Sequence, residues 1–200
     1  MKKVTLLLFL LLQEPPPALA DETVEQVVAV VNEDLLFLSD LRRDNLFFGD
    51  GVDASLQDQI GHRINHQLLL NEAKRFVLES PSEKEIGQSI KVIQHRFQNE
   101  GEFQDRMEAM GMTLEELKGE VVDRLLIATF LQDRIGFFIF VTDEEVDQYD
   151  QTDRNDFKGM SPKDRNESIQ ATLKAKKEKA KIDDYIAQLQ SRAKIQINVR

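Results

Sequence analysis

Apolar residues spaced three and four positions apart recur along most of the chain, and this spacing predicts a mainly helical protein. The strongest repeat runs from Ala54 to Val77, where an apolar stripe widens until the C-terminal end is apolar nearly all round. A helix with that pattern buries its apolar end, so we expect it at the centre of the domain. After Ala20 the only prolines are Pro81 and Pro162, each just before a strong helical pattern, where proline is tolerated.

Polar residues at fixed spacings mark where further helices begin and end. Capping boxes, in which Ser or Thr is followed three positions later by Glu, are expected at Ser82/Glu85, Thr113/Glu116 and Thr142/Glu145. The first of these helices is predicted to end at Asn99–Gly101, and a short helix over 103–110 is stopped by Gly111. Ser39 is predicted to cap a short helix that runs through Phe48 and is broken by the glycines at 49 and 51.

Both ends of this helical region carry patterns typical of strands. The β-branched run Val27–Val31 and the apolar run Leu35–Leu38 flank the turn residues Asn32–Asp34, which predicts a hairpin. Apolar and polar residues alternate over Lys194–Val199, which predicts a terminal strand that needs a partner. We therefore expect a mainly α protein whose small sheet joins the N-terminal hairpin to the C-terminal strand. A long amphipathic helix opened by Ser161 completes it.

The first 20 residues have the organisation of a secretory signal. Lys2 and Lys3 precede the apolar run Val4–Leu12, and Ala18-Leu19-Ala20 has the form of a cleavage site. This predicts export and a mature chain that starts near Asp21, because the apolar run is too short to span a bilayer as an anchor. No other stretch is apolar for long enough to cross a membrane, so we expect no stable membrane insertion after cleavage. The chain has no cysteine, so a packed core and not disulfides must supply stability in an oxidising compartment.

Charge is distributed unevenly along the chain, whose net charge is −10. Residues 21–160 carry 14 basic and 30 acidic side chains, whereas residues 161–200 carry ten basic and five acidic ones. An acidic body argues against nucleic acid as a partner. The opposite signs suggest that the C-terminal arm folds back on the body. We divide the chain into a signal at 1–20, a helical domain at 21–150, a linker at 151–160 and an arm at 161–200.

Candidate catalytic and metal-binding motifs are weak. His62 and His66 have the spacing of helical zinc ligands, but Arg63 stands where a general-base glutamate would be, and His95 is the only other histidine. We expect two solvent-facing histidines and no metal site. The sequence shows no phosphate-binding loop, nucleophile elbow or Cys–His pair. We therefore predict neither a catalytic centre nor a cofactor.

Two groups of apolar residues lie where burial is difficult. One is a run of five consecutive large hydrophobic residues between two helices, at 137–141, and the other gathers methionines around a loop. Exposed, they would form an interaction surface, for which methionine is well suited. Buried, they would be core beneath the C-terminal arm. The candidate binding residues are Phe103, Met107, Met110, Met112, Phe137, Phe138 and Phe140.

The order of several motifs resembles the SurA family of periplasmic chaperones, which is related to PpiD and PrsA. The similar segments are AVVN with Ser39-Asp40-Leu41, INHQLLLNEA over Ile64–Ala73, GMTLEEL over Gly111–Leu117, VTDEEV over Val141–Val146, and the final helix and strand. The resemblance as a whole covers nearly all of residues 24–200. The resemblance implies a SurA N-terminal-like helical domain on which the C-terminal piece packs.

One departure from the family concerns its enzyme domain. Relatives insert one or two parvulin-type prolyl isomerase domains after the segment that ends near Tyr149, and here a short linker follows instead. The resemblance therefore implies a periplasmic chaperone core without the isomerase, which holds unfolded, apolar-rich polypeptide clients such as outer-membrane proteins. Relatives more often carry polar residues at 137, 138 and 140, so the phenylalanines here favour an exposed client or dimer contact.

Three alternatives remain open at this point. The protein could be a dedicated assembly or secretion partner of one specific protein. It could be an enzyme, as a degenerate prolyl isomerase. It could also form a homodimer in which two protomers exchange the C-terminal arm.

Overall fold

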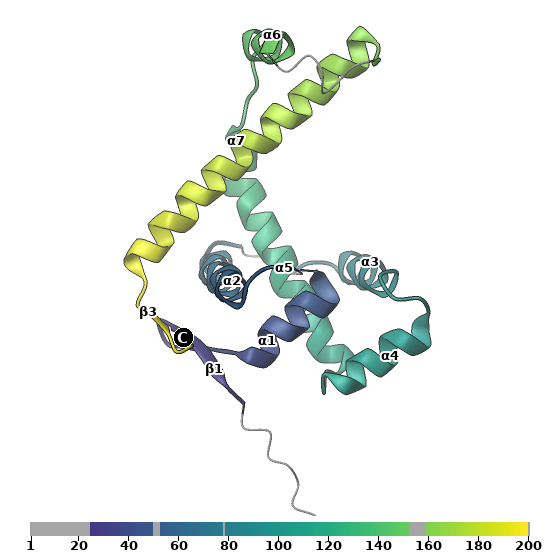
Figure 1. The fold of residues 1–200 in the computed structure, drawn as a ribbon, viewed down its shortest axis with the longest axis vertical. Helices are drawn as coiled ribbons and strands as arrows, with labels where there is room; N and C mark the ends of the chain where they lie inside the picture. Colours follow the sequence, from purple (N-terminus) through teal and green to yellow (C-terminus); the bar gives the residue numbers. More distant parts are fainter. Residues whose placement is uncertain (1–24, 50–52, 78, 153–158, 200) are drawn as a thin grey trace, which may run out of the picture.

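The computed structural model describes residues 25–49, 53–77, 79–152 and 159–199. The predicted signal at 1–20 and most of the predicted linker lie outside these residues. The fold is mainly helical with one small antiparallel sheet, as the sequence pattern predicts (Figure 1). The elements in chain order are β1 (Val27–Val31), β2 (Asp34–Phe37), α1 (Leu38–Arg43), η1 (Asp44–Phe48), α2 (Leu56–Phe76), α3 (Glu83–Gln94), α4 (Glu100–Ala109), α5 (Leu114–Arg134), η2 (Gly136–Phe138), α6 (Asp143–Thr152), α7 (Pro162–Arg192) and β3 (Ile195–Ile197).

The sheet joins the two ends of the described chain. Its strand order is β2-β1-β3, and both pairings are antiparallel, which confirms that the C-terminal strand pairs with the N-terminal hairpin. Asn32 sits in the hairpin turn with a left-handed φ of 57°, a conformation that asparagine tolerates well. Its backbone N–H donates to the Lys194 carbonyl at 2.7 Å, and its side-chain oxygen accepts from the Lys194 N–H at 3.0 Å. One residue thus fixes both the turn and the entry of β3.

Helices α2 and α5 form the centre of the body. Ile60, Ile64 and Leu68 of α2 pack beneath the sheet, and Leu69, Leu70 and Ala73 pack against α5. The apolar residues over 68–73 are therefore buried, as the all-round pattern predicts, whereas Phe76 in the last turn is exposed. The other side of α5 packs with α3, α4 and η1 in a separate cluster around Phe47.

Most predicted helix ends are confirmed, because the capping side chains form the expected bonds. All three capping boxes are present, and Gly49 and Gly111 end their helices with φ of 74° and 56°. The expectation that Asn99 ends the preceding helix is wrong. Helix α3 ends at Gln94, and Asn99 caps α4, since its side-chain oxygen accepts from the Glu102 N–H at 2.9 Å.

Helix α1 also differs from the prediction. It begins at Leu38 instead of after Ser39, because the Asp40 carboxylate accepts a hydrogen bond from the Phe37 N–H at 2.8 Å. Its continuation, η1, is wound as a π-helix, which the sequence pattern did not predict.

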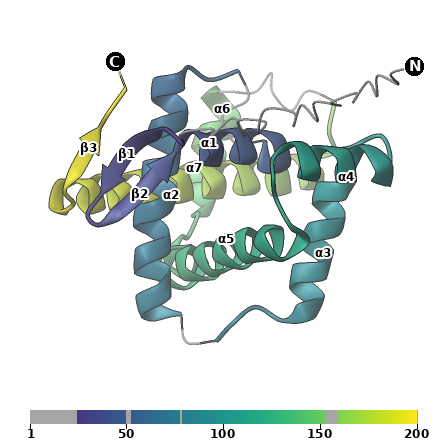
Figure 2. The same cartoon turned by 90° about the horizontal axis from the view of Figure 1, so that it is seen from below.

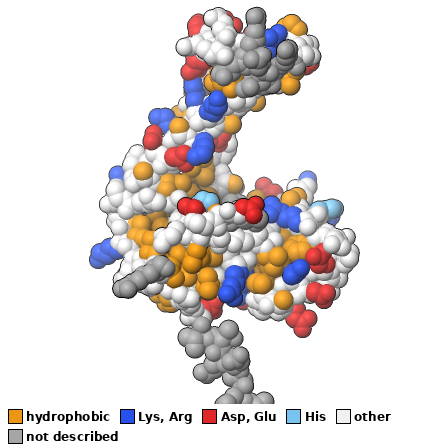
Figure 3. Space-filling model, viewed as in Figure 1, with side chains coloured by type: hydrophobic (Ala, Val, Ile, Leu, Met, Phe, Trp, Pro, Cys, Tyr) orange, Lys and Arg blue, Asp and Glu red, His pale blue; other side chains and the backbone are white. Residues whose placement is uncertain are grey.

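An outer arm, made of α6 and the outer half of α7, stands away from the other helices (Figure 1). Buried Val146 and Ile169 line the seam between its two helices. Ion pairs from Lys177 to Glu145 at 2.6 Å and from Arg165 to Asp150 at 3.4 Å join the same helices. The inner half of α7 packs on α2. The surface between the outer arm and the α3–α4 end of the body is concave (Figure 3).

No single helix within the described ranges combines the length and the apolar character that a membrane span requires. The segment Leu114–Phe138 and helix α6 meet these criteria only when taken together, and they are bent by 95° relative to each other. The core helix of a folded protein meets the same criteria, and buried side chains of α5 pack against α2 and α3.

Candidate functional site

The methionine cluster belongs to the core. Phe103, Met107 and Met112 are buried, and Met110 is half-buried against them. Their neighbours come from η1, α3 and α5, and the buried cluster contains no residue of α7. The interpretation of these four residues as an exposed binding surface is therefore wrong. They are core, but not beneath the C-terminal arm.

The phenylalanines between α5 and α6 are exposed. Phe137, Phe138 and Phe140 expose 63%, 71% and 73% of their surface. Helix α5 ends in a 3₁₀ turn, in which the Phe138 N–H donates to the Ile135 carbonyl at 3.0 Å. This turn buries Ile135 and directs the following two phenylalanines to solvent. Of the two interpretations that the sequence left open for this run, its burial as core is wrong for these three residues.

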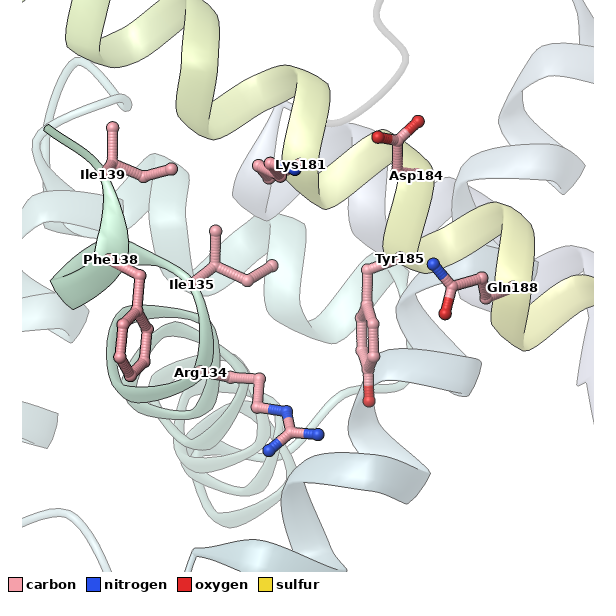
Figure 4. Close-up of a pocket in the computed structure, with 8 residues that line it drawn as sticks. All are labelled: Arg134, Ile135, Phe138, Ile139, Lys181, Asp184, Tyr185 and Gln188. Atoms are coloured by element: carbon pink, nitrogen blue, oxygen red, sulfur yellow. The ribbon is translucent and has the colours of Figure 1, made fainter. Parts of the chain in front are cut away.

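A cleft of about 380 Å³ opens beside these phenylalanines, between the end of α5 and the inner half of α7 (Figure 4). Its walls are formed by Arg134, Ile135, Phe138 and Ile139 on one side and by Lys181, Asp184, Tyr185 and Gln188 on the other. Phe138 and Tyr185 stand on opposite sides of the cleft, and the Arg134 side chain extends between them (Figure 4). The cleft thus combines apolar and aromatic side chains with an equal number of polar or charged ones.

Aromatic contacts continue from the cleft into the body. The Tyr185 ring lies 5.9 Å from the Phe130 ring, which stacks at 6.0 Å on the half-exposed Phe76 of α2. The Tyr185 hydroxyl donates to the Glu72 carboxylate at 3.2 Å. Burial and the nearby negative charge of Glu72 raise the pKa of Tyr185, so its hydroxyl stays protonated and can donate. The tyrosine wall is therefore held in place by packing and by a hydrogen bond.

The segment that carries Phe140 is tied to α7. The Lys177 ammonium donates to the backbone carbonyl of Phe140 at 2.7 Å and pairs with the Glu145 carboxylate at 2.6 Å. Hydrogen bonds from Lys177 and from the Thr142 N–H lower the pKa of Glu145, so the carboxylate remains charged. This lysine fixes the path of the chain on both sides of Thr142.

The cleft rim carries positive charge that is free to meet a partner. Among the described residues, neither Arg134 nor Lys181 takes part in an ion pair, and both are exposed. Of the described residues that line the cleft, Asp184 is the only acidic one. The cleft therefore favours an apolar group with neutral or acidic neighbours, on a protein that is otherwise acidic.

His66 differs from the sequence-based expectation of two solvent-facing histidines. His62 is exposed, but both ring nitrogens of His66 are buried and have no hydrogen-bond partner among the described residues. Burial, together with the positive charges of Arg63, Arg124 and Lys74, lowers the pKa of His66 to about 3. Within the ranges that the structure describes, no three His, Cys, Asp or Glu side chains are placed to hold a metal ion.

A buried charge cluster beside His66 was not identified from the sequence. Asp44 accepts from Arg124 at 2.7 Å and pairs with Arg63 at 3.4 Å, and the Arg124 guanidinium lies 3.7 Å from the centre of the Phe48 ring. The cluster joins η1, α2 and α5. The sequence feature that points to this cluster is Arg63, a charged residue that directly precedes Ile64 in the apolar stripe of α2.

Neither the family models nor the curated proteins searched contain a match to the chain.

Proposed function

We propose that the protein is a SurA-like periplasmic chaperone core that lacks the prolyl isomerase domain and holds unfolded, apolar-rich polypeptides, including outer-membrane proteins in transit. Its client site would be the aromatic cleft together with Phe137, Phe138 and Phe140. The observation that carries the proposal is the exposure of these three phenylalanines beside an open cleft.

Leaving phenylalanine in water forgoes a large stabilisation. Burying one such side chain is worth roughly 1.5–3 kcal/mol, and this chain leaves three unburied within four positions. Contiguous exposed apolar surface on a folded protein commonly marks a contact site. A cleft of about 380 Å³ lies within the usual size range of ligand sites and is large enough to admit an aromatic side chain.

The remaining support comes from the resemblance and from the chain ends. The family resemblance implies a C-terminal piece that packs on the N-terminal domain, and the pairing of β3 with β1 agrees with this. The proposed periplasmic location rests on the signal-like residues 1–20, which stay a prediction. Binding of this kind needs neither a nucleotide nor a cofactor, because it uses shape and apolar surface alone.

A triple variant tests the proposal. Phe137→Ser, Phe138→Ser and Phe140→Ser together should abolish the suppression of aggregation when a urea-denatured outer-membrane β-barrel protein is diluted into buffer, as followed by light scattering. The matched control replaces three other exposed apolar residues, Leu56, Leu114 and Met160, with Ser. The control should suppress aggregation as well as the unchanged protein does.

The thermal midpoint of the triple phenylalanine variant shows whether these residues form a binding site or part of the core. The aromatic variant should melt within a few degrees of the unchanged protein, because its altered side chains are exposed. Full suppression of aggregation by that variant would contradict the proposal. Crosslinking in the periplasm then distinguishes a general chaperone, which holds many chains, from a dedicated partner, which holds one in stoichiometric amount.

A further inference from the structure

The β3 edge, one of the two margins of the small sheet, offers backbone hydrogen-bonding groups that no described residue uses. Strand β3 lies at the margin of the sheet, with β1 as its one neighbouring strand among the described residues (Figure 2). The Asn198 N–H donates to the Val28 carbonyl at 2.9 Å, and the Lys194 carbonyl accepts from Asn32. In an antiparallel ladder, alternate residues face the partner strand. The N–H and C=O groups of Ile195 and Ile197 therefore point away from β1.

The side chains of this edge are apolar and only partly covered. Ile195 is opposite Val31 and Ile197 is opposite Ala29, so both isoleucines lie on the sheet face that those buried residues direct into the core. Ile195 and Ile197 themselves are exposed. The apolar face of the sheet thus continues to its margin and stops there without a covering strand. Charge and proline commonly protect an open edge; Lys194 directly precedes β3, but the strand itself, Ile195-Gln196-Ile197, contains neither.

We infer that the β3 edge binds an extended segment of the client by adding it to the sheet as a fourth strand, an inference that rests on the proposed chaperone function. Backbone bonds to Ile195 and Ile197 would hold the client main chain whatever its sequence. Alternate apolar side chains of the client would cover the two isoleucines. The segments that fit best alternate apolar and polar residues, as the strands of membrane β-barrels do.

The position of the edge suits a client that also enters the aromatic cleft. Gln188 in the cleft wall precedes Ile195 by seven residues, so their Cα atoms are at most roughly 25 Å apart. A client segment of about ten residues spans roughly 33 Å when extended, which is enough to reach both. Pairing with β3 of a second copy is less suitable, because two three-residue strands bury far less than the ~800 Å² per partner of a stable dimer.

A proline substitution tests the edge without breaking the existing ladder. Ile197→Pro removes an outward N–H and leaves the bonds of Gln196 and Asn198 to β1 intact. The matched control, Ile197→Val, keeps that N–H. The probe is a fluorescein-labelled 14-residue peptide that alternates Phe or Val with Ser or Gln, measured by anisotropy. The proline variant should bind it about tenfold more weakly, and the valine variant within twofold of the unchanged protein.

The outcomes separate this inference from the proposed function. If the unchanged protein does not bind the peptide at all, the proposed function fails. If Phe138→Ser weakens binding but Ile197→Pro does not, the cleft stands and the edge is not a client site. If light scattering shows a dimer that Ile197→Pro dissociates while peptide binding is unchanged, a second copy occupies the edge and the inference is overturned.

A second measurement covers the case in which the proline variant does not fold. Two variants of the peptide are then used, one N-methylated at its odd residues (the odd twin) and one at its even residues (the even twin). The affinity of each for the unchanged protein is measured by anisotropy. Strand addition uses the N–H groups on one edge of the client, so one twin should bind about tenfold more weakly than the parent peptide. Equal affinity of both twins and the parent would overturn the inference.

Discussion

Lys177 donates a hydrogen bond to the backbone carbonyl of Phe140 across 37 positions of sequence, at 2.7 Å. The same ammonium pairs with Glu145, so one side chain of α7 fixes both the exposed aromatic segment and the start of α6. The presentation of the phenylalanines therefore depends on a residue outside the apolar surface itself.

Removing this contact should weaken client binding without unfolding the protein. We expect Lys177→Met to loosen the segment around Phe140 and to lower peptide affinity several-fold, because the aromatic groups lose a fixed position. Anisotropy with the alternating peptide measures the change. Lys174→Met, which alters an exposed lysine of the same helix, should have no effect. Equal affinities of the two variants would show that Lys177 does not position the site.

The buried charge cluster should be costly to break. Asp44→Ala removes the buried carboxylate that pairs with both Arg63 and Arg124, while Arg63 keeps its pair with Glu120 at 3.6 Å, and we expect the free energy of unfolding to fall by about 3–5 kcal/mol. Urea denaturation measures this loss. The exposed Asp105 gives the control, since Asp105→Ala should change stability by no more than about 0.5 kcal/mol. A similarly small loss for Asp44→Ala would mean that the cluster contributes little.

His66 should make the protein sensitive to acid. Its pKa is about 3 in the folded state against an ordinary value of 6.5, so below pH 6.5 the unfolded chain binds a proton that the folded chain does not. Stability contributed by neutral His66 is therefore complete above pH 6.5. It is lost at up to about 1.4 kcal/mol per pH unit as the pH falls toward 3.

The matched variant for this prediction is His66→Phe, which keeps a ring of similar shape and cannot take up a proton. Its free energy of unfolding, measured by urea denaturation between pH 7 and pH 4, should fall less steeply than that of the unchanged protein. Carboxylates contribute equally to both curves, so the difference isolates His66. Parallel curves would show that His66 keeps an ordinary pKa.

Met107 distinguishes core from contact surface. Met107→Ala removes a buried side chain packed among α3, α4 and α5, and it should cost about 2–5 kcal/mol of stability. Peptide affinity per folded molecule should stay unchanged, as measured by anisotropy well below the melting temperature. Met160→Ala, at an exposed position, should alter neither quantity. A loss of peptide affinity without a loss of stability in Met107→Ala would show that the methionine cluster belongs to the client site.

Local chemistry explains why most of the fold was predictable. A capping box satisfies backbone donors within four residues, so the starts of the helices after Ser82 and Thr113 can be predicted from the sequence alone. The alternation over Lys194–Val199 likewise predicted a strand, and the hairpin pattern over residues 27–38 supplied its expected partner. Asn99 was assigned to the wrong helix because asparagine can either end one helix or cap the start of the next. The hydrogen bond from the Glu102 N–H to the Asn99 side chain shows that it caps α4.

The candidate site was only half predictable, because composition does not reveal which apolar group the fold covers. Met107 and Phe138 both belong to groups that looked difficult to bury, yet one is core and the other is exposed. The difference arises from the 3₁₀ turn that buries Ile135, a tertiary outcome with no periodic pattern. Asp44 and Arg124 were missed because charged residues are rarely buried unless paired, and their pairing spans 80 positions.

The pairing of β1 with β3 also orders the events of folding. Ala29 lies opposite Ile197, so two strands that are 168 positions apart in the sequence pair with each other. The β1–β2 hairpin can form early, because its strands are neighbours in the sequence, but the sheet is complete only when β3 has joined it. Pairing over so long a separation is slow compared with helix formation, because the chain loses the entropy of closing the loop before the strands make contact. The helices between the two strands therefore form before the sheet is complete, which makes the joining of β3 a late step in folding.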